Sequence, residues 1–361
     1  HNCKIIILSH LGKIKSKQDL KKYTLAPIAK RLLELLNANN RSKIHVVFSN
    51  HTRSSAIVEK VAALNSREIL MVENTRFEDY PSNYESSCNE ELSKFWASLG
   101  DIFVNEAFAS SHRKHASTYG IAKYIPGYIG FRVQEELEML DKYILNAEHP
   151  FTVVMGGAKL EDKIKVIEKL LPLCDHLLLT GGIANTFLKA LNINIGFSLC
   201  SNDEELIEKI KQILLQYRSK IVLPFDAIVG SSYDKEYTSL KMINKLDDNE
   251  IIYDLGHKTI EKYSIYLNES QTVFINGTAG KYEDPRYANG TKEILAALNY
   301  SGANVIVGGG DCVAAVNKFN YKDAFTYLCT GGGASLDYIA NGSLIALEPL
   351  KKEENYEVLD F

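Results

Sequence analysis

The chain has 361 residues, more than a single hydrophobic core usually accommodates, so we expect two domains. Its hydrophobic content of 45% and formal net charge of -4 indicate an ordinary globular protein, with no reason to expect nucleic-acid or membrane binding. No apolar run approaches the roughly 20 residues that span a bilayer, and no signal-peptide pattern opens the chain. Six scattered cysteines lack disulfide or zinc spacing, which predicts free thiols and a cytoplasmic protein.

Strand and helix patterns alternate along residues 1–128, which we interpret as the first domain. Short apolar runs are typical of buried strands, and the segments between them have the periodicity of amphipathic helices. This alternation predicts a parallel sheet covered on both faces. The expected strands are 4–8, 44–48, 69–72 and 101–104, and the expected helices are 25–36, 55–64 and 90–99.

Polar and basic side chains gather directly after these expected strands. In open α/β sheets the ligand crevice lies outside the carboxyl ends of the strands. Arg grips phosphate or carboxylate with a planar fork, so the set favours an anionic ligand. The alternative is that each basic residue is simply solvated in its loop. The set comprises His10, Lys13, Arg76, His112, Arg113 and His115.

A long helical pattern over 131–145 follows Pro126 and Gly127 and precedes Pro150, and we interpret 129–146 as a connecting helix. Beyond it the alternation restarts, which indicates a second domain at 147–345. The remaining 346–361 form a C-terminal tail, whose packing on the first domain is left open. The expected strands of the second domain are 151–155, 176–179, 221–223, 272–275, 304–307 and 327–329.

Glycine-rich segments follow most strands of the second domain, and most of them open a helix. Such turns let backbone N–H groups approach a ligand closely, and phosphate is the usual anion at a helix start. Tight helix–strand packing explains any one of them, but several together favour a phosphate-binding domain. Neither a P-loop nor a dinucleotide fingerprint is present.

Lys159 and Lys163 follow Gly156 and Gly157 at the expected start of a helix that continues through Ile167. Their spacing of four predicts one shared face of the first helical turn. Two cations at this positive end of the helix dipole make most sense beside an anion. A solvated face neutralised by the neighbouring acidic residues is the alternative.

These residues give the chain a resemblance to the phosphoglycerate kinase family that covers nearly its whole length. The order and spacing of the matching runs together are far more specific than any one run. In the first half the runs are Ser9 to Gly12, Glu73 to Phe77 and His112 to Ser117. In the second half they are Gly156 to Lys163, Gly181 to Ala184, Asn276-Gly277, Gly308 to Asp311 and Thr330 to Leu336.

The resemblance implies an α/β fold with two doubly wound, Rossmann-like parallel-sheet domains, joined by a long helix around a ligand cleft. It implies a cytoplasmic monomer of glycolysis, which transfers a phosphoryl group from 1,3-bisphosphoglycerate to MgADP and gives 3-phosphoglycerate and MgATP. Such transfer depends mainly on positioning and charge neutralisation. Closure of the two domains by hinge-bending would exclude water from the acyl phosphate.

Residue roles follow from the resemblance as well. It implies that the first domain binds phosphoglycerate and the second binds the nucleotide, with Asp311 as the Mg2+ ligand. The implied substrate-binding residues are His10, Lys13, Arg76 and Arg113, and the implied catalytic residues are Lys159, Arg113, Gly310 and Gly333. The implied nucleotide-binding residues are Gly157, Lys159, Lys163, Gly181, Gly182, Asn276, Glu283, Gly309, Gly310, Asp311 and Cys312.

The chain departs from the family mainly at its start, where the family's Arg-Val-Asp-Phe-Asn strand and arginine-bearing helix are missing. We therefore expect an unpaired sheet edge and exposed apolar surface in the first domain. A fragment of a longer product is the favoured interpretation, and an inactive nucleotide-binding relative is the alternative. A nicotinamide-dependent dehydrogenase is a weaker hypothesis. Smaller departures are Lys13 for Arg, Cys312 for Ser or Thr, Thr278, Lys281 and His257.

Overall fold

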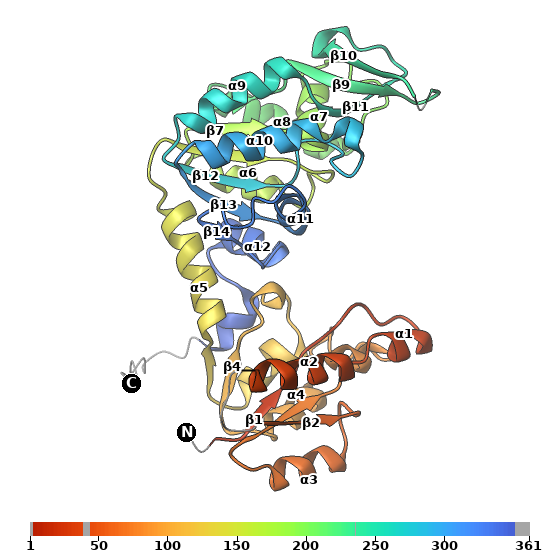
Figure 1. Cartoon of the computed structure of the whole chain (residues 1–361), viewed down its shortest axis with the longest axis vertical. Coiled ribbons are helices and arrows are strands. Elements are labelled where there is room, and N and C mark those ends of the chain that lie inside the picture. The colour runs from red at the N-terminus through yellow and green to blue at the C-terminus, as the bar shows by residue number, and fades with distance from the viewer. Residues whose placement is uncertain (1–2, 39–43, 235, 351–361) are drawn as a thin grey trace. The chain divides into compact units, whose positions relative to one another are not determined.

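The structure is a computed structural model that describes residues 3–38, 44–234 and 236–350 (Figure 1). It divides into two compact units. The first unit runs to Val133 and includes the segment from Ser343 onward, and the second covers Gln134–Gly342. No helix in the described part of the chain is long and apolar enough to cross a membrane.

The first unit contains two parallel sheets, one of three strands in the order β1-β3-β2 and one that pairs β4 with β5. The strands are β1 Ile5–Ile7, β2 His45–Ser49, β3 Glu68–Val72, β4 Phe103–Asn105 and β5 Gly127–Ile129. The helices are α1 Lys17–Lys22, α2 Ala26–Asn37, α3 Ser55–Ala63 and α4 Glu90–Ala97. The predicted elements of this half are therefore confirmed to within two residues at each end.

The central strand β3 is covered on both faces, because alternate side chains of a strand point to opposite sides. Leu70 and Val72 belong to a buried cluster with Ile57 of α3 and Trp96 of α4. Met71 packs on the other side with Leu25 and Ala29 at α2. This layering predicts that the ends of β1 and β3 are held firmly at the carboxyl edge of the sheet.

The predicted unpaired edge is confirmed at β1, which among the described strands pairs with β3 alone. A groove of about 700 Å³ runs along this edge, and its lining includes Ile6, Trp96 and Phe103. Ile102, which lines the groove, and Val104 of β4 are 63% and 52% exposed. The first unit therefore leaves apolar surface uncovered.

The second unit is built on a six-stranded parallel sheet in the order β14-β13-β12-β6-β7-β8. The strands are β6 Phe151–Met155, β7 His176–Leu179, β8 Ile221–Val222, β12 Thr272–Asn276, β13 Asn304–Gly308 and β14 Tyr327–Leu328. Helix α5 Phe131–Leu140 contains the boundary between the two units. The other helices of the second unit are α6 Ile164–Leu170, α7 Gly181–Ala190, α8 Glu204–Tyr217, α9 His257–Asn268, α10 Asn289–Tyr300, α11 Gly310–Lys318 and α12 Gly333–Asn341. All six predicted strands are confirmed.

One face of this sheet is buried under α9, α10 and α11, whose side chains form a cluster with β12 and β13. Tyr263 of α9 is fully buried there, and its hydroxyl donates to the carbonyl oxygens of Leu179 and Val222. The adjacent placement of α9 and α10 is visible in Figure 1. A core of this size fixes the strand ends on which the candidate site depends.

Sequence patterns missed a small antiparallel sheet that follows β8. It has the order β10-β9-β11, with β9 Asp226–Ser231, β10 Thr238–Met242 and β11 Glu250–Leu255. The predicted connecting helix also differs in detail, since α5 ends at Leu140 and a π-helical turn spans Asp141–Leu145.

The described part of the C-terminal tail belongs to the first unit. A short 3-10 helix spans Ile345–Leu350, and the backbone N–H of Ala346 donates to the carbonyl oxygen of Ser111 at 3.0 Å. Residues 351–361 of the predicted tail lie outside the described residues.

Candidate functional site

The sheet of the second unit has a topological switch point between β6 and β12. From β6 the chain moves outward through β7 to β8, and from β12 it moves the other way through β13 to β14. Ligands of open α/β sheets bind in the crevice that such a reversal leaves at the carboxyl ends of the strands. The four central strands all leave the sheet there into glycine-bearing loops.

The loops after β6 and β12 are in close backbone contact. The N–H of Gly156 donates to the carbonyl oxygen of Asn276 at 2.9 Å. Gly277 has φ +95°, and a Cβ on it would lie 2.3 Å from the carbonyl oxygen of Gly156. Only glycine fits this position, because any side chain would push the two loops apart.

The start of α7 also contacts the loop after β6. A Cβ on Gly182 would lie 2.8 Å from the carbonyl oxygen of Ala158. Gly181 opens the helix with φ +58°, a conformation that favours glycine. The free N–H groups of this helical turn therefore face the same region as Gly157, as an anion-binding edge requires.

The prediction that Lys159 and Lys163 share a helical turn is wrong. Residues 157–163 form bends and turns, and α6 begins only at Ile164, with Lys163 as its N-cap residue. The carbonyl oxygen of buried Leu160 accepts from the N–H groups of Lys163 and Ile164 at 2.8 and 2.9 Å. Because this turn satisfies the two N–H groups and buries Leu160, the helix does not extend back to Lys159.

Lys163 is the structural centre of this edge. Its Nζ donates to the carbonyl oxygen of Gly156 at 2.6 Å and to that of Asn276 at 3.3 Å. Burial lowers the pKa of Lys163 to about 8, while the thiol of Cys312 and the carboxylate of Asp311 act in the opposite direction. These effects show that the ammonium group lies near the start of α11.

Asn276 connects this centre to β13. Its side chain is buried, and its Nδ2 has no hydrogen-bond partner in the described part of the chain. A Cβ on Gly308 or Gly309 would lie 2.9 or 3.2 Å from that Nδ2. A buried amide nitrogen without a partner is costly, so a ligand oxygen at this position would satisfy it.

The first turn of α11 follows directly. Gly309 is the N-cap residue with φ +87°, and Asp311 is exposed in the first turn. Cys312 is buried in the core, and burial raises the pKa of its thiol to about 12. Cys312 can therefore meet a ligand only through its backbone N–H.

The glycine loop after β14 is held by a residue that the sequence did not single out. Glu136 of α5 is fully buried, and its Oε1 accepts from the backbone N–H of Thr330 at 2.9 Å and from the Thr330 hydroxyl. Gly332 then caps α12 with φ +49°, and Gly333 is the first helical residue. Glu136 thus fixes the entry to this helix start.

Two predicted residues of the second unit lie at the surface. Lys159 and Glu283 are both exposed, and no side-chain hydrogen bond or ion pair holds either one among the described residues. The backbone near Glu283 is anchored, because Lys318 Nζ donates to the carbonyl oxygen of Tyr282 at 2.8 Å. Their side chains are therefore available to a ligand but not preorganised.

In the first unit, the loop after β1 is tied to the loop after β3. Asn74 Nδ2 donates to the carbonyl oxygens of Leu11 and Tyr23, each at 2.8 Å, and its Oδ1 accepts from the N–H of Arg76 at 3.1 Å. Buried Glu73 accepts from the N–H groups of Leu25 and Asn74, both at 2.8 Å. These contacts place His10 and Arg76 at one edge of the sheet.

Electrostatics show that several predicted residues gather there. Partial burial lowers the pKa of His10, and the guanidinium groups of Arg76 and Arg113 lower it further. Burial, followed by the same two arginines, lowers the pKa of His115 to about 4. The His115–Glu85 contact at 3.9 Å is therefore not an ion pair at neutral pH. We call His10, Arg76, Arg113 and His115 the basic cluster.

Arg76 is a buried member of the basic cluster with an unsatisfied donor. It is 8% exposed, and its buried Nε has no hydrogen-bond partner in the described ranges. Its Nη1 lies 3.8 Å from Asp79 Oδ2, but both oxygens of Asp79 already accept from Ser86. Its unused donors favour an anionic ligand.

Not every predicted basic residue joins this cluster. Lys13 is exposed, and within the described residues no interaction connects it to the cluster. Asp79 and Glu85 were missed, although both contact cluster members. Sequence offered no signal for Glu85, which lies 32 residues from its partner Ser117.

The fold and these two sets of residues are typical of an α/β protein with sites suited to phosphate-bearing ligands. The family model described as phosphoglycerate kinase matches residues 1–342. The phosphoglycerate kinase of Fusobacterium nucleatum is 39% identical over 98% of this chain and 88% of its own length. That of Mycoplasma genitalium is 42% identical over 97% and 87%.

Solved structures agree. The phosphoglycerate kinase of Coxiella burnetii superposes with a TM-score of 0.80 at 35% identity, covering 96% of this chain and 85% of that one. The enzyme of Pyrococcus horikoshii gives 0.78 at 29% identity with the same coverage. The chain belongs to the phosphoglycerate kinase family. It functions as a phosphoglycerate kinase, an enzyme of glycolysis.

Proposed function

We propose that the two units divide the substrates of phosphoglycerate kinase. The basic cluster of the first unit binds 3-phosphoglycerate or 1,3-bisphosphoglycerate, and the glycine-rich edge of the second binds ADP or ATP. The observation that carries this proposal is that four glycine-bearing strand exits lie at the switch point, where half-buried Lys163 bonds to two of them. Phosphate groups suit such an edge because it offers backbone N–H groups and one fixed cation.

Within the first unit, His10, Arg76 and Arg113 bind the phosphoglycerate, with Lys13 as an outer contact. A neutral His10 donates a hydrogen bond, whereas the two guanidinium groups supply charge. The lowered pKa values of His10 and His115 support this division, because nearby cations that repel one another are stabilised by an anion.

Within the second unit, Lys163, Asn276 and the helix starts hold the nucleotide phosphates. Lys159 is free to follow the transferring phosphoryl group, and Glu283 is free to meet the ribose. Backbone N–H groups complete the site. They come from Gly157, Gly181, Gly182, Gly309, Gly310, Cys312 and Gly333.

Mg2+ accompanies the nucleotide in this proposal, with Asp311 as its protein ligand. Mg2+ commonly uses one or two carboxylates together with substrate phosphates. Asp311 fits because it is exposed at a helix start beside Lys163, and the described residues form no cluster that would hold a metal by themselves. The ion would neutralise phosphate charge during transfer.

We further propose a cytoplasmic monomer. The cysteines support a reducing compartment, since no disulfide joins any of the six in the described part of the chain and three of them are buried.

A coupled turnover assay with 3-phosphoglycerate and MgATP tests these roles. Lys159→Ala is expected to lower kcat by about 100-fold or more while melting temperature is unchanged. Lys165→Ala, at an exposed position of α6, is the matched control and should behave as the wild type. Equal turnover in the two variants would exclude Lys159 from the reaction.

Binding measurements separate the two units. MgADP should raise the melting temperature of the wild type and of Arg76→Met, whereas 3-phosphoglycerate should protect only the wild type. Loss of MgADP binding in Arg76→Met would contradict the division of substrates between the units.

A further inference from the structure

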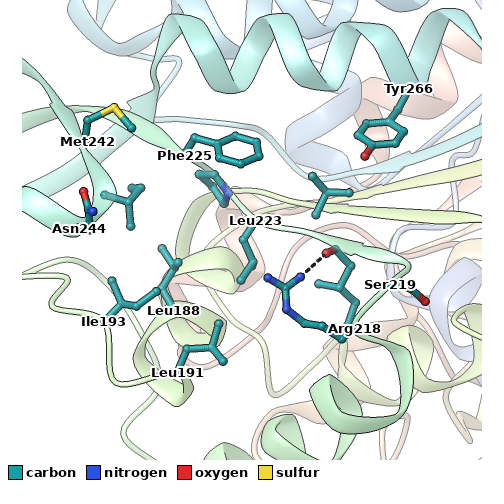
Figure 2. Close-up of a pocket in the computed structure, with 14 residues that line it drawn as sticks. Leu188, Leu191, Ile193, Arg218, Ser219, Leu223, Phe225, Met242, Asn244 and Tyr266 are labelled. Carbon is teal, nitrogen blue, oxygen red and sulfur yellow. Dashed lines mark hydrogen bonds between the residues drawn. The ribbon is translucent and has the colours of Figure 1, made fainter.

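A pocket in the second unit lies beside β8, the edge strand of the six-stranded sheet (Figure 2). It has a volume of about 480 Å³, which is within the range of small-molecule sites. The pocket contacts the C-terminal end of α7, about 15 Å along that helix from Gly181. It is therefore separate from the proposed nucleotide site.

The pocket has an apolar floor and an apolar rim. Leu188, Ile221 and Ile243 form the floor and are 2%, 2% and 5% exposed. Leu191 and Phe225 stand at the rim, and they are 38% and 46% exposed. Figure 2 shows side chains from α7, from the segment after β8 and from the end of β10 around one opening. An apolar group placed there would remove this surface from water.

Among the described residues that line the pocket, Arg218 alone is charged. Its Nη1 donates to the carbonyl oxygen of Ile221 at 3.1 Å, which orients the guanidinium group beside Leu223. A guanidinium carries five N–H donors, so most of them stay available after this bond. A second cation is close, because Lys262 Nζ lies 4.9 Å from the ring centroid of Tyr266, which also lines the pocket.

We infer that this pocket binds an amphipathic carboxylate, with its hydrocarbon chain on the apolar floor and its carboxylate on Arg218. The apolar lining accounts for the chain, and a single oriented guanidinium without an acidic neighbour in the lining accounts for one negative charge. A strongly polar ligand would leave the floor uncovered, and a neutral apolar one would leave Arg218 unused. The inference does not depend on the proposed roles in phosphoryl transfer.

Sodium octanoate and its neutral counterpart octanol test the inference by isothermal titration on the whole chain. Octanoate should bind at one saturable site, and octanol should bind about tenfold more weakly or worse, since a charge-assisted hydrogen bond is absent. Arg218→Met keeps an apolar stem and removes the charge, so it should weaken octanoate about tenfold and leave octanol unchanged. Arg31→Met, at an exposed position of α2, is the matched control and should bind both as the wild type does.

Leu191→Glu gives an independent check, because Leu191 lies at the exposed rim and its replacement should not impair folding. It should abolish octanoate binding by repulsion, while melting temperature without ligand and turnover remain at wild-type values. The inference is overturned if octanoate shows no saturable binding, if octanol binds as well as octanoate, or if Arg218→Met binds octanoate with unchanged affinity.

Discussion

Lys163 Nζ donates to the carbonyl oxygen of Gly156 at 2.6 Å, so a lysine at the start of α6 closes onto the end of β6 seven residues earlier. The same Nζ reaches the carbonyl oxygen of Asn276 at 3.3 Å, at the end of the neighbouring strand β12. One ammonium group therefore joins the two strand exits on either side of the switch point. It holds the glycine turns in place and supplies positive charge at the same location.

Replacement of this bridge should affect nucleotide use far more than stability. Lys163→Met keeps a side chain of similar length but removes the Nζ donor from the carbonyl oxygen of Gly156, while the carbonyl oxygen of Asn276 keeps the N–H of Gly156 as a donor. We expect kcat/KM for MgATP to fall by about 100-fold or more, because a fixed phosphate contact is lost. The free energy of unfolding should change by only about 1 to 2 kcal/mol. Steady-state kinetics and urea unfolding measure the two quantities.

Lys165→Met is the matched control for this prediction, since Lys165 lies two residues further along α6 and is exposed. It should retain the wild-type kcat/KM. A Lys163→Met protein with full activity would mean that the phosphates bind elsewhere on the edge.

The pH dependence of nucleotide binding should report the same ammonium group. Burial lowers the pKa of Lys163 from 10.5 to about 8 in the folded protein. Above pH 8 the free protein therefore loses this proton, and MgADP affinity should fall by up to about tenfold per pH unit. Titrations of MgADP from pH 7 to 9.5 should show this decline in the wild type and a flat profile in Lys163→Met.

The free energy of unfolding should increase with pH, whereas the affinity for MgADP decreases. Between pH 8 and 10.5 the unfolded chain holds a proton on Lys163 that the folded protein has released. The contribution of Lys163 to the free energy of unfolding therefore rises with pH across this window. Ligand-free wild type should gain stability relative to Lys163→Met as the pH increases, and a constant difference would contradict the lowered pKa.

Glu136 should act on the nucleotide through the loop that it holds. Glu136→Ala removes the acceptor for the N–H and hydroxyl groups of Thr330, which precede Gly331 to Gly333. A looser loop presents its N–H groups less accurately, so KM for MgATP should rise severalfold. Glu136→Gln keeps one acceptor oxygen and should restore most of the affinity.

Glu138→Ala is the control for this variant, because Glu138 is exposed on the same helix. Its KM should equal that of the wild type. If Glu136→Ala lowered only the melting temperature and left KM unchanged, Glu136 would support the fold without positioning the loop.

Much of the fold was predictable because parallel sheets have strong local signals. The apolar runs that became β6, β7, β12 and β13 lie between glycine-rich turns, and both features are visible in the sequence. The antiparallel strands were missed since Thr238–Met242 alternates exposed and half-buried positions and carries a weak apolar signal. Its pairing with β9 depends on tertiary contacts.

In the candidate site, too, features encoded locally in the sequence were predicted, whereas contacts between residues far apart in the chain were missed. The position of His10, Arg76 and Arg113 after strands predicted that they would gather, and their mutual effect on pKa values agrees. The start of α6 was misjudged because the periodicity of Ile164 and Ile167 marks a helix but does not fix its first residue. Glu136 escaped notice because its partner lies 194 residues away.

Glu85 provides a test of the electrostatics behind the basic cluster. Its carboxyl group is 1% exposed and accepts from the backbone N–H and the hydroxyl of Ser117. Burial raises its pKa to about 7, with the Ser117 hydrogen bonds acting against the increase. Between pH 4.5 and 7 the folded protein therefore holds a proton that the unfolded chain has lost. The contribution of Glu85 to the free energy of unfolding falls as the pH rises through this window.

Glu85→Gln removes this titration and can still bond to Ser117 through its amide group. Near pH 4.5 the free energy of unfolding of the variant should equal that of the wild type or be slightly lower. Toward pH 8 the variant should become progressively more stable than the wild type. The gain should approach about 1.4 kcal/mol for each unit of the pKa shift, up to a few kcal/mol. His115 titrates between pH 4 and 6.5 in both proteins, so its opposite effect cancels in the difference. Urea unfolding at pH 4.5, 6 and 8 measures the trend, and a stability difference that does not depend on pH would show that Glu85 is ionised in the folded protein throughout.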